Sequence, residues 1–326
     1  MRVGTTKKRM ITTIAALAGV FLVIYALILT GVLGDYYFAT LVSLGISIIL
    51  AVGLNLITGF TGQFSLGHAG FMSIGAYVCA IITTRIPTDW GFILGVFAGA
   101  CAAALVGIAV GLPTLRLNGD YLAIATLGMA EIIRIVMQNL EITNGAAGLS
   151  DLPRFMNWPY LFVLTVGTVV IVKNFLNSTH GRACISVRED EIAAQSMGIS
   201  PTKYKVIAFT MGAFFAGIAG AMYASYFYFI NPGTFGFKKS IDILVVVVLG
   251  GMGSLSGTII AAMILQLIST LLQSFAEIRM IIYALLLVLM MIFRPQGLMG
   301  EKELTLDLIK KIKLPFLNRD RKGGES

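Results

Sequence analysis

The residues of this chain that could do chemistry are polar groups set in or beside long apolar runs. A polar group in hydrocarbon is costly unless it meets a partner or a water-filled cavity, so such residues mark substrate or ion routes. We therefore predict a translocation pathway lined by Asn55, Gln63, Ser65, His68, Glu131, Gly251 and Ser254. Glu131 and Arg134 stand three apart on one helical face, and a local ion pair is the slightly preferred alternative for them.

Neither a catalytic site nor a metal site is expected. The only histidines are His68 and His180, and the three cysteines, Cys79, Cys101 and Cys184, have no metal-binding spacing. No nucleophile, base and orienting group form a recognisable set. We expect no catalytic residues, no metal and no cofactor in this chain.

Two glycine-rich stretches interrupt the apolar runs, GFTGQFSLGHAG at 59–70 and GGMGSLSG at 250–257. Each contains a glycine followed within three residues by Ser-Leu and another glycine. Paired interruptions in the two halves of a transporter are typical of discontinuous helices at a substrate path. Tight turns between adjacent spans are an equally weighted alternative. Neither stretch continues as Gly-Lys-Ser/Thr, so neither indicates a nucleotide loop.

The elements that position these groups follow from composition. The chain is 57% hydrophobic and 12% charged, whereas ordinary soluble domains are about 25% charged. A membrane span needs about 20 apolar residues. We predict an all-α, polytopic integral membrane helical bundle of about eight to ten transmembrane helices, some interrupted by glycine. The predicted spans are 10–33, 38–58, 64–84, 91–112, 120–140, 160–176, 206–230, 240–252, 255–272 and 278–293.

Basic residues indicate the orientation. With the N-terminus inside and ten crossings, most of the 24 Lys and Arg fall on the cytoplasmic side, as the positive-inside rule expects. The others, Lys238 and Lys239 among them, fall outside or within a span. The net charge of +8 therefore indicates membrane orientation and no nucleic-acid partner.

Small residues recur every fourth position along two predicted spans. Such stripes let helix backbones approach closely in lipid. Packing inside one subunit is the favoured interpretation, and contact with a second membrane subunit is the alternative. The stripes are Gly91, Gly95, Gly99, Ala103, Gly107 and Gly111 in one span and Gly212, Ala216 and Gly220 in another, beside Ala213, Gly217 and Ala221.

One charged, polar stretch, residues 178–205, lies between apolar segments, and we call it the elbow. Good helix formers at 188–195 predict a short helix that Gly198 can end, and Ser200-Pro201 is typical of the cap and first position of the next helix. A rigid charged projection of this kind is a natural place for a soluble partner. An ordinary solvated loop is the alternative.

Four ordered blocks closely resemble the permease subunits of branched-chain amino acid ABC importers, of the LivM type. The resemblance spans about residues 42–297. The blocks are GLNL (53–56) with SLGHAGFMSIGAY (65–77), LRLNGDYLAIATLG (115–128), VREDEIAAQSMGI (187–199) with KVIAFTMGAFFAGIAG (205–220), and VLGGMGS (248–254).

The resemblance implies a non-enzymatic permease subunit of an ATP-driven importer for leucine, isoleucine and valine. The implied partners are a second related permease, two cytoplasmic ATP-binding subunits that hydrolyse ATP, an extracytoplasmic substrate-binding protein and membrane lipid. Urea or short amides are the alternative cargo. An ion-coupled secondary transporter is less favoured, because Glu131 is the one carboxylate clearly within a span.

The distribution of charge and the resemblance together imply an organisation. Residues 1–300 are expected to form one transmembrane permease domain in the plasma or inner membrane of a prokaryote, with cytoplasmic termini, a cytoplasmic coupling loop at 178–205 and a cytoplasmic tail at 301–326. In such importers a permease helix with a Glu-Ala-Ala-like and Gly signature docks on the ATPase. Ile192 is inserted in that signature here. The predicted coupling residues are Arg182, Arg188, Glu189, Asp190, Glu191, Ala194 and Gly198.

Overall fold

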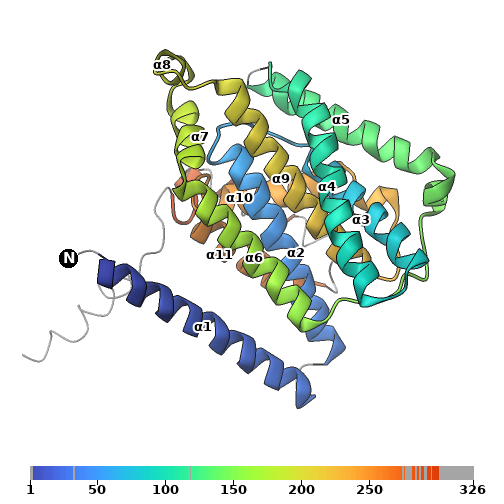
Figure 1. The fold of residues 1–326 in the computed structure, drawn as a ribbon. Coiled ribbons are helices and arrows are strands. Elements are labelled where there is room, and N and C mark those ends of the chain that lie inside the picture. The colour runs from blue at the N-terminus through green and yellow to red at the C-terminus, as the bar shows by residue number, and fades with distance from the viewer. Residues whose placement is uncertain are drawn as a thin grey trace, which may run out of the picture.

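The described part of the chain is built from helices joined by short loops (Figure 1). The computed structural model describes residues 3–31, 34–117 and 119–273, and beyond them 275, 281, 282, 285, 288, 289, 292–294 and 296–300. The α-helices are α1 (Val3–Leu29), α2 (Asp35–Thr58), α3 (His68–Arg85), α4 (Asp89–Thr114), α5 (Asp120–Asn139), α6 (Trp158–Asn177), α7 (Thr179–Glu189), α8 (Glu191–Ser196), α9 (Pro201–Ala224), α10 (Phe237–Gly250) and α11 (Leu255–Leu271). Short 3-10 turns are η1 (Glu141–Thr143), η2 (Gly145–Ala147) and η3 (Pro232–Phe235). The predicted all-α class is confirmed.

The protein is a polytopic helical membrane protein. Among the described residues, four helices, α2, α4, α6 and α9, are long and apolar enough to cross a membrane by length and composition. The apolar stretch of α1 (Ala15–Leu29) and helix α11 are shorter. The total of eight to ten spans stays a prediction, because most of the expected span 278–293 and the whole tail 301–326 lie outside the described residues.

Helix α9 is the centre of the bundle and packs against α2, α3 and α4. Its small residues make the close approach possible: a Cβ on Gly217 would lie 2.8 Å from the Ala100 Cα and from the Ala103 Cβ of α4. A Cβ on Gly107 would lie 2.6 Å from the Ala213 Cβ. The predicted packing of these stripes within one subunit is confirmed.

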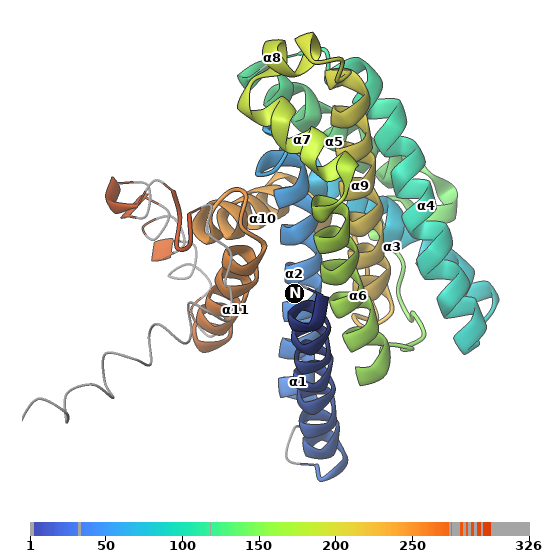
Figure 2. The ribbon, with the colours of Figure 1, turned by 60° about the vertical axis from the view of Figure 1, so that its left-hand side comes forward.

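Figure 2 shows how the remaining helices are arranged about this centre. Helices α3 and α4 lie on one side of α2, α6 and α9, and α10 and α11 lie on the other. The elbow helices α7 and α8 sit at one end of the bundle. Helix α1 joins the bundle through Phe21, which stacks on Trp158 at the start of α6.

Several predicted span boundaries are wrong, two of them because a loop begins or ends elsewhere. The third helix begins at His68 and not at residue 64, because residues 59–67 form a loop in which Gly62 takes a positive φ of 73° and Leu66 N donates to Thr126 Oγ1. The helix expected to run to residue 230 ends at Ala224. Past that point the backbone bonds to the 149–156 segment, as in the isolated bridge between Leu149 and Ile230.

Candidate functional site

The two glycine-rich interruptions meet in space, although about 200 residues separate them in the chain. Asn55, fully buried in α2, joins them: its Nδ2 donates to the Ser254 carbonyl (3.0 Å) and to Thr258 Oγ1 (2.8 Å). Its Oδ1 accepts from the Gly253 N–H at 3.0 Å. A Cβ on Gly59 would collide with Asn55 and Gly253, so glycine is what permits this approach. We call residues 59–67 the first break and residues 251–254 the second break.

Arg188 connects the elbow to both breaks. Its Nη1 donates to the Gly59 carbonyl at 2.8 Å. Its aliphatic stem packs over the first break, where a Cβ on Gly62 would lie 3.3 Å from Arg188 Cγ. The guanidinium also lies beside the second break, because a Cβ on Gly253 would come within 2.6 Å of Nη1. One cationic side chain thus spans three parts of the chain.

The elbow contains two helices where one was expected. The predicted helix at 188–195 is interrupted at Asp190, whose Oδ1 accepts from Ile192 N and Ala193 N, both at 2.9 Å. Asp190 therefore caps α8, as acidic residues do at helix starts. Gly198 follows the end of α8 with a positive φ of 83°, which agrees with its predicted role. Ser200 precedes α9, but its side chain makes no cap hydrogen bond.

The other predicted coupling residues mostly hold the elbow together. Glu191 Oε2 lies 2.7 Å from Lys205 Nζ, Glu189 faces Arg188 at 3.8 Å, and Ala194 is buried. Arg182 is exposed and donates to the Asn177 carbonyl. Their proposed contact with an ATPase stays a prediction.

Two elbow residues, Ile192 and Met197, are not among the predicted coupling residues but stand out by their exposure. Ile192 and Met197 are 79% and 83% exposed, unusual values for large apolar side chains on a polar loop. The sequence indicated both positions, because each is an apolar residue within an otherwise charged stretch. Cys184, by contrast, packs inward, and burial raises the pKa of its thiol to about 11, so the group is neutral at pH 7.

The predicted pathway residues lie in the packed interior. Asn55, Gln63, Ser65, His68 and Ser254 are each at most 2% exposed. Within the described residues, neither amide atom of the Gln63 side chain has a hydrogen-bond partner. Buried polar groups left without partners cost about 1–3 kcal/mol each. Gly251 takes a positive φ of 108° at the start of the second break.

Glu131 behaves differently from the rest of the predicted set. Its Oε2 accepts from Arg134 Nε at 2.6 Å, and both side chains are about one-third exposed. The local ion pair on α5, which was the preferred alternative for these two residues, is confirmed. No group of three His, Cys, Asp or Glu suited to a metal ion occurs in the part of the chain that the structure describes.

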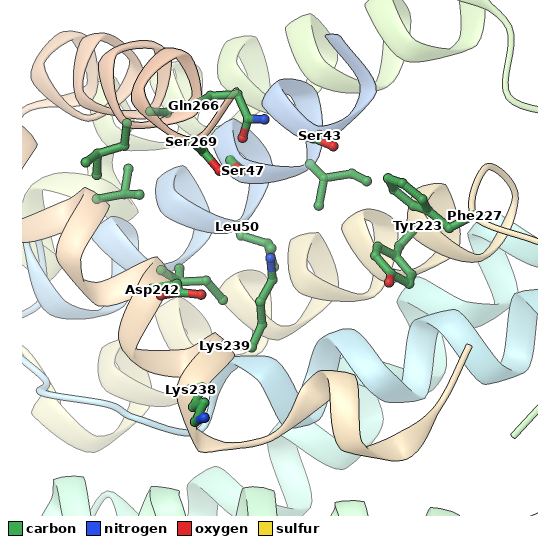
Figure 3. Close-up of a pocket in the computed structure, with 15 residues that line it drawn as sticks. Ser43, Ser47, Leu50, Tyr223, Phe227, Lys238, Lys239, Asp242, Gln266 and Ser269 are labelled. Carbon is green, nitrogen blue, oxygen red and sulfur yellow. The ribbon is translucent and has the colours of Figure 1, made fainter. Parts of the chain in front are cut away.

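A cavity of about 350 Å³ lies between α2, α10 and α11 and the end of α9 (Figure 3). Charged and polar groups share this cavity with aliphatic and aromatic ones. Its lining is Ser43, Ile46, Ser47, Leu50, Tyr223, Phe227, Lys238, Lys239, Asp242, Ile243, Val246, Ala262, Leu265, Gln266 and Ser269. None of the predicted pathway residues is among them.

A second cavity of about 230 Å³ continues the first toward the ends of α2 and α11. The two share Ser43, Phe227, Gln266 and Ser269. The second adds Tyr36, Ala39, Thr40, Thr270 and Gln273. Residues 36–50 of α2 line the two cavities in order, Asn55 follows on the same helix, and the first break follows the end of that helix. We call the two adjoining cavities the polar path.

Sequence reasoning missed the charged residues of this path. Lys238 and Lys239 were placed at the border of a span, whereas the cavity puts them level with residues 43–50, the middle of α2. The hydropathy of a helix as short as the 14-residue α10 does not indicate how deep in the membrane the helix lies. The sequence did contain one indication of their position. A charged residue beside an apolar run is costly in a membrane unless it faces a polar cavity or a partner.

Comparison with known proteins places the chain in a family. Residues 36–293 match the family model described as branched-chain amino acid transport system / permease component. The chain is 40% identical over 289 residues to the high-affinity branched-chain amino acid transport system permease protein LivM of Escherichia coli, covering 78% of this chain and 68% of that protein. It is 27% identical over 290 residues to LivH of Salmonella typhimurium, covering 78% and 91%. No solved structure matches.

Proposed function

Because the chain belongs to the branched-chain amino acid transport permease family, we propose that it forms half of the translocation pathway of an ATP-driven importer for leucine, isoleucine and valine. A second, related permease forms the other half, as the likeness to both LivM and LivH supports. Two ATP-binding subunits dock at the elbow on the cytoplasmic side, and a substrate-binding protein delivers cargo to the opposite face. Residues 1–300 act as one permease domain, with both termini and the tail 301–326 cytoplasmic.

The polar path is the part of the route that this chain contributes. The path runs from Tyr36 and Gln273 at one end to Lys239 and Asp242 of α10, beside the middle of α2. The breaks close its inner end, where Asn55 joins them. In this arrangement the route is open on the side of the binding protein and shut toward the elbow.

The contact of Arg188 with both breaks is the observation that carries the proposal. Closure of the ATPases moves the elbow, and Arg188 transmits that movement to the Gly59 carbonyl at the seal. Once the breaks separate, water reaches Gln63 and His68, which are buried in the closed arrangement. The predicted pathway residues thereby line the inner half of the route, and the cavity residues line the outer half.

The exposed edge of α10 is where the second permease completes the route. Phe237 and Ile241 are 45% and 37% exposed, and Lys238 and Asp242 are exposed on the same short helix. A strip that mixes exposed apolar side chains with charged ones is unfavourable both in lipid and in open water. A second membrane subunit would cover it and enclose the cavity.

Uptake by the reconstituted complex tests the proposed function. The chain, a LivH-like permease, the two ATPases and the binding protein are placed together in proteoliposomes, and radiolabelled leucine uptake is measured with internal ATP. Uptake should require ATP and withstand a protonophore. Uptake of urea in place of amino acids would overturn the assigned cargo, and loss of uptake under the protonophore at constant ATP would overturn ATP coupling.

Replacing Ile192 with aspartate should weaken docking of the ATPases. The exposed apolar tip of α8 is expected to enter a cleft on the ATPase, and a carboxylate there must lose its hydration. The fraction of ATPase that co-purifies with the permeases should fall about tenfold or more. Thr202→Asp is the matched control, because Thr202 is exposed in the first turn of α9, where a carboxylate suits the helix. Equal co-purification in both variants would contradict docking through Ile192.

A further inference from the structure

We propose that Lys239 and Asp242 bind the charged head of an α-amino acid inside the cavity between α2, α10 and α11. Lys239 receives the α-carboxylate, and Asp242 receives the α-ammonium group. The apolar side of the cavity receives the aliphatic side chain. This inference rests on the proposed function and assigns a substrate site within that route.

The spacing of the two charges fits a zwitterion. Lys239 and Asp242 are three residues apart on α10, so their Cβ atoms lie about 5–6 Å apart on one helical face. In Figure 3, Lys239 extends from α10 toward Ser47 and Leu50 of α2, with Asp242 beside it on the same helix. An α-amino acid carries both its charges on one carbon and can lie between such a pair. Urea and short amides carry no net charge, so they can hydrogen-bond to these groups but cannot form an ion pair with either of them.

The pair also lies beside the middle of a membrane-spanning helix. Lys239 and Asp242 share a cavity with Ser43, Ser47 and Leu50, in the middle of a 24-residue span. Charged side chains at that depth are rare in membrane proteins, and they mark substrate or ion pathways. A zwitterionic substrate would pair with both charges at once.

The rest of the cavity suits a branched aliphatic side chain. Ile46, Leu50, Val246 and Leu265 supply aliphatic surface, and Tyr223 and Phe227 supply aromatic surface. A volume of about 350 Å³ is within the range of about 300–1,000 Å³ typical of small-ligand sites. The site therefore combines a charged end and an apolar wall, as leucine, isoleucine and valine require.

Protection of a single engineered thiol tests the site directly. Ser47 lines the cavity and is partly exposed, so a Ser47→Cys thiol can react with a methanethiosulfonate reagent added from outside. The complete reconstituted transporter is labelled with and without L-leucine, and modification at position 47 is read by peptide mass. Leucine should slow the labelling. Asp242→Asn and Lys239→Met should each raise the half-protecting leucine concentration about 10- to 100-fold.

Leucinamide, which lacks the carboxylate, distinguishes binding from a structural role. It should protect more weakly than leucine when Lys239 is present, and about as well as leucine when Lys239→Met has removed the partner of the carboxylate. The control for Asp242→Asn is Asp151→Asn, an exposed carboxylate whose positive φ of 57° asparagine tolerates. This control should leave protection unchanged.

The results separate this inference from the function on which it rests. If the complex imports leucine but leucine does not slow labelling, or protects equally in Lys239→Met, the site is overturned and the proposed function stands. If leucinamide is weaker than leucine by the same factor with and without Lys239, the carboxylate contact is overturned. If the unmodified complex imports no amino acid, the proposed function itself is overturned.

Discussion

Replacing Arg188 with methionine is expected to lower ATP-driven leucine uptake at least about tenfold while the chain still inserts and assembles. Methionine keeps much of the length and apolar bulk of the stem but cannot donate to the Gly59 carbonyl. Hydrogen bonds from charged donors contribute about 1.5–3 kcal/mol, which is a factor of about 10 or more in the balance between closed and open breaks. Movement of the elbow would then no longer separate the two breaks.

Measuring ATP hydrolysis and uptake on the same proteoliposomes identifies this uncoupling. The Arg188→Met complex should keep ATP hydrolysis and lose uptake, so that more ATP is consumed for each leucine imported. Arg116→Met is the matched control, because Arg116 is exposed beyond the end of α4. Normal uptake at a normal ATP ratio in Arg188→Met would remove Arg188 from the transmission path.

Arg188→Lys refines the same prediction. Lysine keeps the charge as a compact ammonium but loses the planar, multiply donating guanidinium that lets one side chain lie against both breaks. Uptake between that of the original chain and that of Arg188→Met is expected. Uptake equal to that of the methionine variant would indicate that guanidinium geometry, and not charge alone, maintains the seal.

The two breaks could be predicted from the sequence because glycine and polar residues leave a local signal. Glycines at 59–70 and 250–257 in otherwise apolar runs indicate a break in the helix, with a discontinuous helix and a tight turn between spans weighted equally. Local sequence patterns could not predict that the two breaks meet through Asn55. A buried asparagine amide satisfied from three directions depends on the folding of segments about 200 residues apart.

The elbow and the cavity show where sequence reasoning fails. Arg188 carries the same charge as Arg182 and lies about two turns away, yet one reaches the breaks and the other is exposed. Their difference comes from the direction of α7 against the bundle. Lys239 and Asp242 look like polar residues at the start of a span, and only the placement of α10 beside the middle of α2 makes them part of the cavity lining. Helix orientation and depth are tertiary properties.

The packing of α3 against α9 leads to the other large expected effect, in Gly75→Ala. A Cβ on Gly75 would collide with the backbone of Gly217, including its carbonyl carbon at 2.6 Å. A backbone cannot rotate away as a side chain does, so α3 and α9 must separate along their contact. Overpacking of a close-packed core costs about 1–3 kcal/mol or more. We expect a shorter half-life of the folded chain in detergent on heating, measured by fluorescence size-exclusion chromatography.

Gly128→Ala is the matched control for that experiment, because it makes the same chemical change with the opposite expected sign. Gly128 lies inside α5 and is exposed, and a Cβ there meets nothing within 4 Å. Alanine in a helix interior is more stable than glycine by about 0.5–1 kcal/mol, so its half-life should equal or exceed that of the original chain. If Gly75→Ala survives heating as well as Gly128→Ala does, α3 and α9 do not approach as closely as their glycines allow. The close core against which the cavity helices rest would then have to be revised.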